Sequence, residues 1–385
     1  MLSTSHRAEL ILQSEIRNMS VECDRLGGIN LSQGICDTPS PPAVLAGAHA
    51  AIDAGIHTYT RYDGLAELRG ALSRKLAAYN KITANPDGEI IASAGSTGAL
   101  YCTLLALLNP GDEVILFEPY YGYHLQTLLA VEAVPKFVTT HPPDWRFELA
   151  DVERAIGPRT RAILVNTPSN PSGKVWTQAE LEAIAQLARK HDLFIFTDEV
   201  YEYLTYDGRR HISPATIEIA ADRTITIGSL SKTFSITGWR IGFAAAPPRL
   251  ARTIGYMNDL VYVCAPAPLQ AAAAHALDTL GPEFYEGLRT EYTHKRDRFC
   301  GALARAGFTP YVPQGAYYVL ADVSKVRGGN AKERAMTLLR EAGVAGVPGD
   351  AFFHGRDGDT LIRFCFAKTD ALLDEACRRL EAWRG

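Results

Sequence analysis

The sequence lacks several features that mark particular classes of protein. It has no run of basic residues, and its 39 Lys and Arg are outnumbered by 43 Asp and Glu, which leaves a net charge of −4. This balance argues against nucleic-acid binding as the main task. No apolar run reaches the roughly 18 residues that a membrane helix needs, and the segment 1–20 lacks the apolar core of a signal peptide. We therefore expect a cytoplasmic protein with no nucleic-acid or membrane partner.

Paired cysteines are also missing. The seven cysteines are scattered along the chain, and none forms a CxxC pair. Zinc sites and small disulfide frameworks depend on such paired spacings. We therefore predict reduced thiols and no metal site.

What the sequence does contain is an alternation of short apolar runs with amphipathic helical patterns. The runs predict strands at 89–93, 113–119, 161–166, 193–200, 224–229 and 240–246. Most are apolar at consecutive positions, which is typical of strands buried on both faces. The clearest helix spans 177–192, with Thr177 as its N-cap and Glu180 at the capping-box position. This alternation predicts an α/β fold with a doubly wound, mostly parallel sheet that has helices on both sides.

The chain is long enough for more than one domain. Its 385 residues correspond to two or three domains of roughly 150 residues each. After about Leu280 the pattern changes to a charged helix at 291–307 and antiparallel-looking strands in 316–323, 344–353 and 360–367. We expect a large domain over 45–280 and a smaller α+β domain formed by 1–44 together with 281–385.

Polar and reactive side chains follow several of the predicted strands. Open α/β sheets bind ligands beyond the carboxyl ends of their strands, so these side chains are expected to meet at one rim. The turn AGSTGAL after 89–93 offers free backbone N–H groups to an anion. Asp198 lies near the end of one strand, and Lys232 follows another. Pyridoxal 5′-phosphate needs such a set, namely an amine for its aldehyde, a carboxylate for its ring nitrogen and a phosphate site.

Three segments stand out: NTPSNPSGKVW (166–176), TDEVYEYLTYDG (197–208) and GSLSKTFSITGWRIGF (228–243). They resemble the signature segments of the class I/II aminotransferases, the aspartate-aminotransferase-like enzymes of fold type I. The likeness extends from LSQGICDTPSPP near the N-terminus to LIRFCFA near the C-terminus. It implies a three-layer α/β/α large domain with a smaller α+β domain, and pyridoxal 5′-phosphate as the cofactor.

The resemblance assigns the cofactor ring to four residues. Lys232 matches the lysine that binds the cofactor aldehyde and later moves the substrate Cα proton. Asp198 matches the carboxylate that keeps the ring nitrogen protonated. Tyr201 and Asn170 match the donors to the phenolic oxygen, although Asn170 is also part of an ordinary Asn-Pro turn.

The resemblance also assigns the cofactor phosphate and the face of the ring. A forked cation, hydroxyl groups and a helix start are expected to bind the phosphate, and the matching residues are Ser96, Thr97, Ser229 and Arg240. Without the match, a helix N-cap explains each serine equally well. Tyr121 matches the residue that stacks on the ring, and Tyr120 is the competing choice.

Further matches concern the substrate and a partner subunit. Arg363 alternates with Ile362 and Phe364, and an arginine in so apolar a strand needs an anion. In the family that anion is the substrate α-carboxylate, with Asn170 beside it, whereas an intramolecular ion pair is the alternative. Gly34 matches the position where the N-terminal segment closes over the carboxylate. Tyr59, or else Tyr62, matches the tyrosine that reaches the partner's phosphate, which implies an obligatory homodimer.

We therefore expect an aminotransferase that moves the α-amino group of an L-amino acid to a 2-oxo acid such as 2-oxoglutarate. Aspartate, aromatic and methionine- or glutamine-like donors stay open, because no motif identifies a second arginine for a side-chain carboxylate. A C–S β-lyase acting on cysteine conjugates is the alternative, since one fold supports both reactions. A non-catalytic ligand-sensing domain is a third interpretation, against which the presence of Lys232, Asp198, Arg240 and Arg363 argues.

Overall fold

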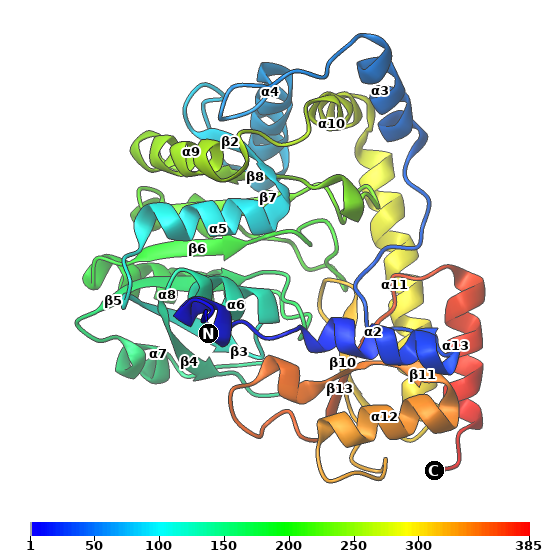
Figure 1. The fold of residues 1–385 in the computed structure, drawn as a ribbon. Helices are drawn as coiled ribbons and strands as arrows, with labels where there is room; N and C mark the ends of the chain where they lie inside the picture. Colours follow the sequence, from blue (N-terminus) through cyan, green and yellow to red (C-terminus); the bar gives the residue numbers. More distant parts are fainter. Residues whose placement is uncertain (1) are drawn as a thin grey trace.

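A seven-stranded sheet forms the centre of the computed structural model, which describes residues 2–385 (Figure 1). The strand order is β2-β8-β7-β6-β5-β3-β4. β8 runs antiparallel to both of its neighbours, and all other neighbouring strands in this sheet are parallel. The bounds are β2 (Ile90–Ala94), β3 (Glu113–Glu118), β4 (Val134–Thr139), β5 (Thr160–Asn166), β6 (Phe194–Asp198), β7 (Thr224–Ser229) and β8 (Ile241–Ala245). The predicted mostly parallel α/β sheet is confirmed.

Helices cover both faces of this sheet because successive strand residues point in opposite directions. Leu164 and Phe196 pack toward one face, and Ile163 and Ile195 pack toward the other. The first face is covered by α5 (Gly95–Leu107), α6 (Gly122–Ala130) and α9 (Pro248–Tyr262). The second is covered by α3 (Pro42–Asp53), α4 (Ala66–Lys75), α7 (Leu149–Ala155), α8 (Gln178–Lys190) and α10 (Ala267–Thr279).

The structure confirms one local prediction and adds one strand that was not predicted. The capping box of Thr177 and Glu180 is present at the start of α8, as predicted. The edge strand β4 is absent from the predicted strands, because Pro135 and Lys136 interrupt its apolar pattern.

A smaller antiparallel sheet, in the order β12-β13-β10-β9, lies beside the large one. Its strands are β9 (Thr309–Tyr311), β10 (Tyr318–Asp322), β12 (Val347–Pro348) and β13 (Leu361–Cys365). In addition, β1 (Ile29–Asn30) pairs in parallel with β11 (Val344–Ala345). The helices around them are α2 (Glu15–Leu26), α11 (Pro282–Arg305), α12 (Ala331–Ala342) and α13 (Asp370–Ala382) (Figure 1).

The two ends of the chain share one hydrophobic core. Met19 and Leu31 from the N-terminal segment pack with Phe364 and Leu380 from the C-terminal part. This common core supports our proposal that 1–44 and 281–385 form one domain. The short helix α1 (His6–Leu10) lies instead against α6 of the large part, where Arg7 pairs with Glu132.

Short helical turns complete the chain: the π-helix η1 (Leu76–Asn80) and the 3₁₀ segments η2 (Pro214–Thr216), η3 (Glu218–Ala220), η4 (Thr237–Trp239) and η5 (Gly349–Phe352). Within residues 2–385, no helix is both long enough and apolar enough to cross a membrane.

Candidate active site

The carboxyl ends of the strands bring the predicted residues to one rim of the large sheet. Asn166 at the end of β5 is in register with Asp198 at the end of β6. Asp198 is in register with Ile227 of β7, and Ser229 at the end of β7 pairs with Gly242 of β8. The parallel register therefore places these polar residues side by side.

The turn from β2 into α5 forms a cradle suited to an anion. Gly95 has a φ of +72°, and a Cβ there would lie 2.3 Å from Arg240 Nη2, so the guanidinium lies against the start of α5. A Cβ on Gly242 would lie 2.6 Å from Ser96 N, which places β8 directly under the same turn. Free backbone N–H groups and the helix dipole favour an anion at such a helix start.

The predicted phosphate residues surround this cradle. Ser229 is buried and donates its hydroxyl hydrogen to the Ile241 carbonyl oxygen at 3.2 Å. Arg240 is exposed, and its Nη1 donates to the Thr237 carbonyl oxygen at 3.0 Å. Thr97 occupies an exposed position in the first turn of α5. The structure thus brings Ser96, Ser229 and Arg240 together and places Thr97 in the same helical turn.

Lys232 lies in the turn after β7, and its amine points toward the N-terminal segment. Nζ donates to the Gly34 carbonyl oxygen at 3.1 Å and lies 5.7 Å from the centroid of the Tyr317 ring. Burial lowers the pKa of the Lys232 amine below the ordinary 10.5, although the nearby Cys36 opposes the shift. A lowered pKa increases the fraction of neutral, nucleophilic amine.

Asp198 is buried and paired with a histidine that the sequence interpretation missed. Asp198 Oδ2 lies 2.8 Å from Nε2 of His124, which is in α6, and Asp198 Oδ1 accepts from Val200 N at 3.3 Å. The segment YYGYH carried the signal, because His124 stands one helical turn after Tyr121.

Tyr121 and Tyr120 point in different directions. The Tyr121 ring meets His124 edge-on, with 5.3 Å between the centroids. The Tyr120 ring is buried near Phe137, and its backbone N–H donates to Phe352. Of the two tyrosines, Tyr121 is therefore the one next to the Asp198–His124 pair.

A cluster of tyrosines surrounds Gly34. Tyr201 Oη lies 3.0 Å from Tyr318 Oη, and burial raises the pKa of Tyr201 well above its ordinary value. Tyr317 Oη donates to the Gly34 carbonyl oxygen at 3.2 Å. A Cβ on Gly34 would lie 1.9 Å from Tyr318 Oη, so only glycine permits this contact.

Arg363 is fully buried in β13 without a counter-ion. Its Nη1 donates to Asn170 Oδ1 at 2.9 Å, its Nη2 donates to the Ser32 carbonyl oxygen at 2.5 Å, and its Nε has no partner. The guanidinium carbon lies 4.3 Å from the Tyr318 ring centroid and 5.1 Å from that of Phe352. Across residues 2–385 no carboxylate pairs with it, so the alternative of an intramolecular ion pair is wrong. An unpaired buried cation is costly, and a guanidinium in this setting is suited to an external anion.

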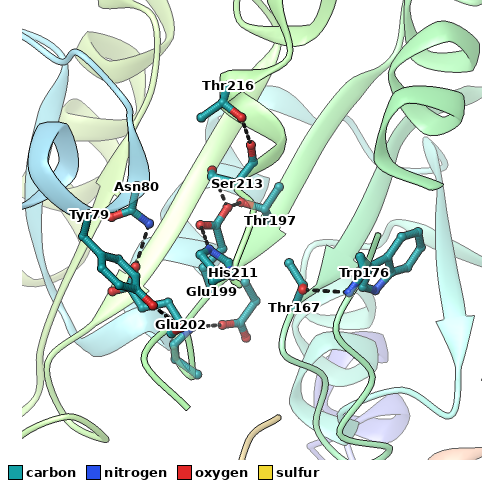
Figure 2. A network of polar contacts seen from close by, with 12 residues as sticks. Tyr79, Asn80, Thr167, Trp176, Thr197, Glu199, Glu202, His211, Ser213 and Thr216 are labelled. Carbon is teal, nitrogen blue, oxygen red and sulfur yellow. Dashed lines mark hydrogen bonds and ion pairs between the residues drawn. The ribbon is translucent and has the colours of Figure 1, made fainter. Parts of the chain in front are cut away.

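The segment that carries Asp198 and Tyr201 is held from behind by Glu199. Figure 2 shows Glu199 beside Thr197, Ser213 and His211. Its carboxylate lies 2.6 Å from Thr197 Oγ1, 2.8 Å from Ser213 Oγ and 2.7 Å from His211 Nε2. This buried carboxylate thereby fixes the start of the segment.

Glu202 fixes the other end of the same segment. Its carboxylate pairs with the buried Lys75 of α4 and accepts from Asn80 Nδ2 at 2.7 Å, and Tyr79 Oη donates to its backbone carbonyl oxygen at 2.7 Å (Figure 2). Ligand atoms of Glu199, Glu202 and His211 lie within 4.8 Å of one another. Because Lys75 already neutralises Glu202, we propose no metal site here.

Tyr59 and Tyr62 occupy the loop between α3 and α4. Tyr59 is 82% exposed, whereas Tyr62 packs edge-on against Tyr256 of α9 with 5.4 Å between the centroids. Tyr59 is therefore the tyrosine that is free to reach a second subunit.

Comparisons with known proteins agree on one family. The sequence matches the model for aminotransferase class I and II over residues 27–380. It is 36% identical over 374 residues to the probable N-succinyldiaminopimelate aminotransferase DapC of Mycobacterium tuberculosis, with 94% of each chain covered. It is 34% identical to aromatic-amino-acid aminotransferase 2 of Thermococcus litoralis, covering 99% of this chain and 98% of the relative. The structure of YbdL from Escherichia coli, described with a methionine aminotransferase function, matches with a TM-score of 0.95 and 30% identity over 100% of both chains.

Proposed function

The chain belongs to the class I and II aminotransferase family, and on this premise we propose a role for each residue of its site and a class of amino-acid donor. It is an enzyme that depends on pyridoxal 5′-phosphate and transfers an amino group from an amino acid to a 2-oxo acid. The chain provides what this cofactor needs: the Lys232 amine, the buried Asp198 carboxylate and the Arg240 guanidinium at a helix start.

Each residue near the cofactor ring has a distinct task. When bound, pyridoxal 5′-phosphate supplies an electron sink for the electron pair released at the substrate Cα. Lys232 Nζ would hold the cofactor aldehyde, and as a free amine it would be the base that takes the proton from the substrate Cα. Asp198, oriented by His124, stabilises the proton on the ring nitrogen. Tyr201 and Asn170 would donate hydrogen bonds to the phenolic oxygen.

The remaining cofactor contacts are to the phosphate and to the face of the ring. Arg240 supplies a fixed positive charge, and the start of α5 supplies backbone N–H groups. The hydroxyl groups come from Ser96, Thr97 and Ser229. Tyr121, next to His124, covers one face of the ring.

The observation that carries the substrate assignment is the unpaired charge of Arg363. We assign the α-carboxylate of the amino acid to this guanidinium, which can donate two parallel hydrogen bonds to it. Asn170 accepts from Arg363, and Gly34 lies against Tyr318, whose ring packs on the guanidinium; we assign both residues to the border of the carboxylate site.

The donor is an L-amino acid with a large neutral side chain. A dicarboxylate donor needs a second free cation, and no motif in the sequence identifies one. Arg61 lies beside Tyr59. Arg61 Nη2 is already paired with Asp63 Oδ2 at 2.7 Å. Aromatic rings of Tyr121, Tyr318 and Phe352 lie around Arg363 and the ring site, and they suit a methionine-like or aromatic side chain.

The active enzyme is a cytoplasmic homodimer. The supporting feature is an apolar patch on the C-terminal end of α9 and the following loop, formed by Tyr256, Leu260, Val261 and Val263, which are 56%, 79%, 42% and 39% exposed. Tyr62 ties the Tyr59 loop to this patch. A second copy seated on the patch places Tyr59 within reach of the partner's phosphate.

Absorbance spectroscopy of the purified holoenzyme tests the proposed donor class. Single L-amino acids are added without any oxo acid, and the visible band of the bound cofactor is followed. Methionine or phenylalanine is expected to bleach the band, and 2-oxoglutarate is expected to restore it. Bleaching by aspartate alone contradicts the donor class. Continuous release of ammonia and pyruvate from a cysteine conjugate, with the band unchanged, contradicts transamination.

A further inference from the structure

Tyr318 contacts both Arg363, the proposed carboxylate residue, and Tyr201, a proposed cofactor residue. Its sequence neighbours and the strand pattern do not mark it as a site residue. Its ring lies 4.3 Å from the Arg363 guanidinium carbon, and its hydroxyl lies 3.0 Å from that of Tyr201. The register explains the first contact, because Arg363 pairs with Leu320, two residues along β10 from Tyr318. Tyr318 is 2% exposed, so bulk water does not compete for its hydroxyl.

The question is which of the two hydroxyls donates in the hydrogen bond between Tyr201 and Tyr318. A tyrosine hydroxyl has one hydrogen to donate and can also accept. Burial raises the pKa of both tyrosines, so both hydroxyls keep their hydrogen. If Tyr201 gives its only hydrogen to the cofactor, the hydrogen between the two tyrosines must come from Tyr318. On its other side the Tyr318 hydroxyl lies against Gly34, whose carbonyl oxygen accepts instead from Lys232 Nζ and Tyr317 Oη.

We propose that Tyr318 is a positioning residue that donates its hydroxyl hydrogen to Tyr201 Oη and thereby directs the hydrogen of Tyr201 at the phenolic oxygen of the cofactor. The inference rests on the proposed function of Tyr201. Chained hydrogen bonds polarise one another in a buried site, so the Tyr318 bond strengthens the one that Tyr201 makes. The ring of Tyr318 has a separate task, which is to support the Arg363 guanidinium.

A spectroscopic titration of the holoenzyme measures this effect directly. The phenolic oxygen carries more negative charge after the Lys232 nitrogen loses its proton, so a donor to that oxygen lowers the pKa of this nitrogen. We expect Tyr318→Phe to raise the pKa by a few tenths of a unit at most, a fraction of the roughly half a unit to one unit that the loss of one ordinary hydrogen bond gives. The charged and titratable groups that influence the Lys232 pKa, namely Cys36, Cys365, Arg240 and Arg363, are unchanged in this variant. Tyr317, whose ring lies 5.7 Å from Lys232 Nζ, is unchanged as well.

Tyr317→Phe is the matched control. Tyr317 is as buried as Tyr318 and its ring is 5.0 Å from that of Tyr201, but its hydroxyl donates to Gly34. We expect Tyr317→Phe to shift the pKa by less than Tyr318→Phe does. Equal shifts in the two variants overturn the proposal.

A double variant separates an effect through Tyr201 from a direct one. We expect Tyr201→Phe to raise the pKa as well, and Tyr201→Phe/Tyr318→Phe to raise it no further, because the second bond acts through the first. Additive shifts overturn the proposal. A wild-type band that does not titrate, or that survives Lys232→Ala, instead contradicts the proposed function of Lys232.

The two tasks of Tyr318 give different kinetics. Tyr318→Phe keeps the ring, so the KM for the amino acid is expected to change by less than about twofold while kcat falls. Tyr318→Leu removes the ring under Arg363 and is expected to raise KM as well, by roughly fivefold to thirtyfold, since a buried cation–π contact contributes about 1–2 kcal/mol. A rise in KM for the phenylalanine variant equal to that for the leucine variant contradicts a separate task for the hydroxyl.

Discussion

Lys232 is a cation whose surroundings favour its neutral form. Its folded-state pKa lies below the ordinary 10.5 because of burial, so the neutral amine accumulates at a lower pH than in a free lysine side chain. We predict that the rate at which the apoenzyme binds pyridoxal 5′-phosphate covalently rises with pH and levels off below 10.5. Stopped-flow absorbance measures this rate, with a free lysine derivative as the control amine. A rate that keeps rising to the pKa of the free amine contradicts the prediction.

Arg363 is a cation that stays charged despite being fully buried. Arg363→Ala removes two charge-assisted hydrogen bonds, each of which contributes about 1.5–3 kcal/mol, so we expect kcat/KM for the amino acid to fall at least about 100-fold. Arg363→Lys keeps the charge but not the fork, and we expect an intermediate loss. Steady-state kinetics measure both, and the absorbance of bound cofactor checks that the site is intact. An equal loss for an amine that has no carboxylate contradicts the assignment.

The residues that could be predicted from sequence share one property. Lys232, Asp198 and Arg363 follow or interrupt apolar runs, so their chemistry is visible in the local pattern. His124 and Tyr318 do not follow or interrupt an apolar run, and for His124 the sequence signal is only its place one helical turn after Tyr121. Their contacts depend on how α6 lies on the sheet and on the register between β10 and β13, which local sequence does not determine.

At the scale of elements, the turn from β2 into α5 leaves no room for a side chain. Gly95→Ala adds a methyl group 2.3 Å from the current position of Arg240 Nη2, at a φ of +72°. The guanidinium can move, so we expect a stability loss of only about 1–2 kcal/mol from the backbone strain. We expect a larger effect on the cofactor, with its dissociation constant raised roughly tenfold or more because the phosphate contact is displaced.

Fluorescence titration of the apoenzyme measures that constant, and Gly287→Ala in α11 serves as the control. A Cβ at Gly287 meets nothing within 4 Å, so this change should leave cofactor affinity unaltered and stabilise the helix slightly. Unchanged affinity in Gly95→Ala contradicts the placement of the phosphate at this turn.

The ion pair between Glu202 and Lys75, which holds the segment that carries Asp198 and Tyr201, gives a second prediction for an element. Glu202→Ala leaves Lys75 buried without its carboxylate, and we expect the free energy of unfolding to fall by about 3–5 kcal/mol. Denaturant unfolding measures the loss. The control is Glu22→Ala, which breaks the exposed pair with Arg25 and should cost no more than about 1 kcal/mol. Equal losses in the two variants would show that the buried pair stabilises the fold no more than an exposed pair does.

The apolar pattern of a strand does not show whether the strand runs parallel or antiparallel to its neighbours. The predicted strand at 240–246 corresponds to β8, and its apolar run resembles those of β6 and β7. Yet β8 runs antiparallel to its neighbours because the chain from β7 returns through a short turn and η4 instead of a crossover helix. The length of the connection, and not the composition of the strand, decided this part of the fold.

At the scale of the whole molecule, the α9 patch determines the proposed assembly. Leu260 is 79% exposed, and Leu260→Asp places a charge where the second copy is expected to pack. We predict a monomer in sedimentation experiments, with cofactor bound more weakly because Tyr59 no longer reaches the partner's phosphate. The control is Val312→Asp, at a residue after β9 that is 54% exposed and outside the patch. A Leu260→Asp dimer with full activity contradicts the proposed interface.

The pairing of Ile29 with Val344 has a consequence for biosynthesis. A chain leaving the ribosome carries Lys232, Asp198 and the cradle at Gly95 well before residue 344 has been made. β1 cannot pair until β11 has been synthesised, and contacts between residues so distant in sequence form late. Arg363 and β13 emerge after that pairing partner. A nascent chain therefore carries the residues that we propose hold the cofactor before it carries the arginine that we propose binds the substrate.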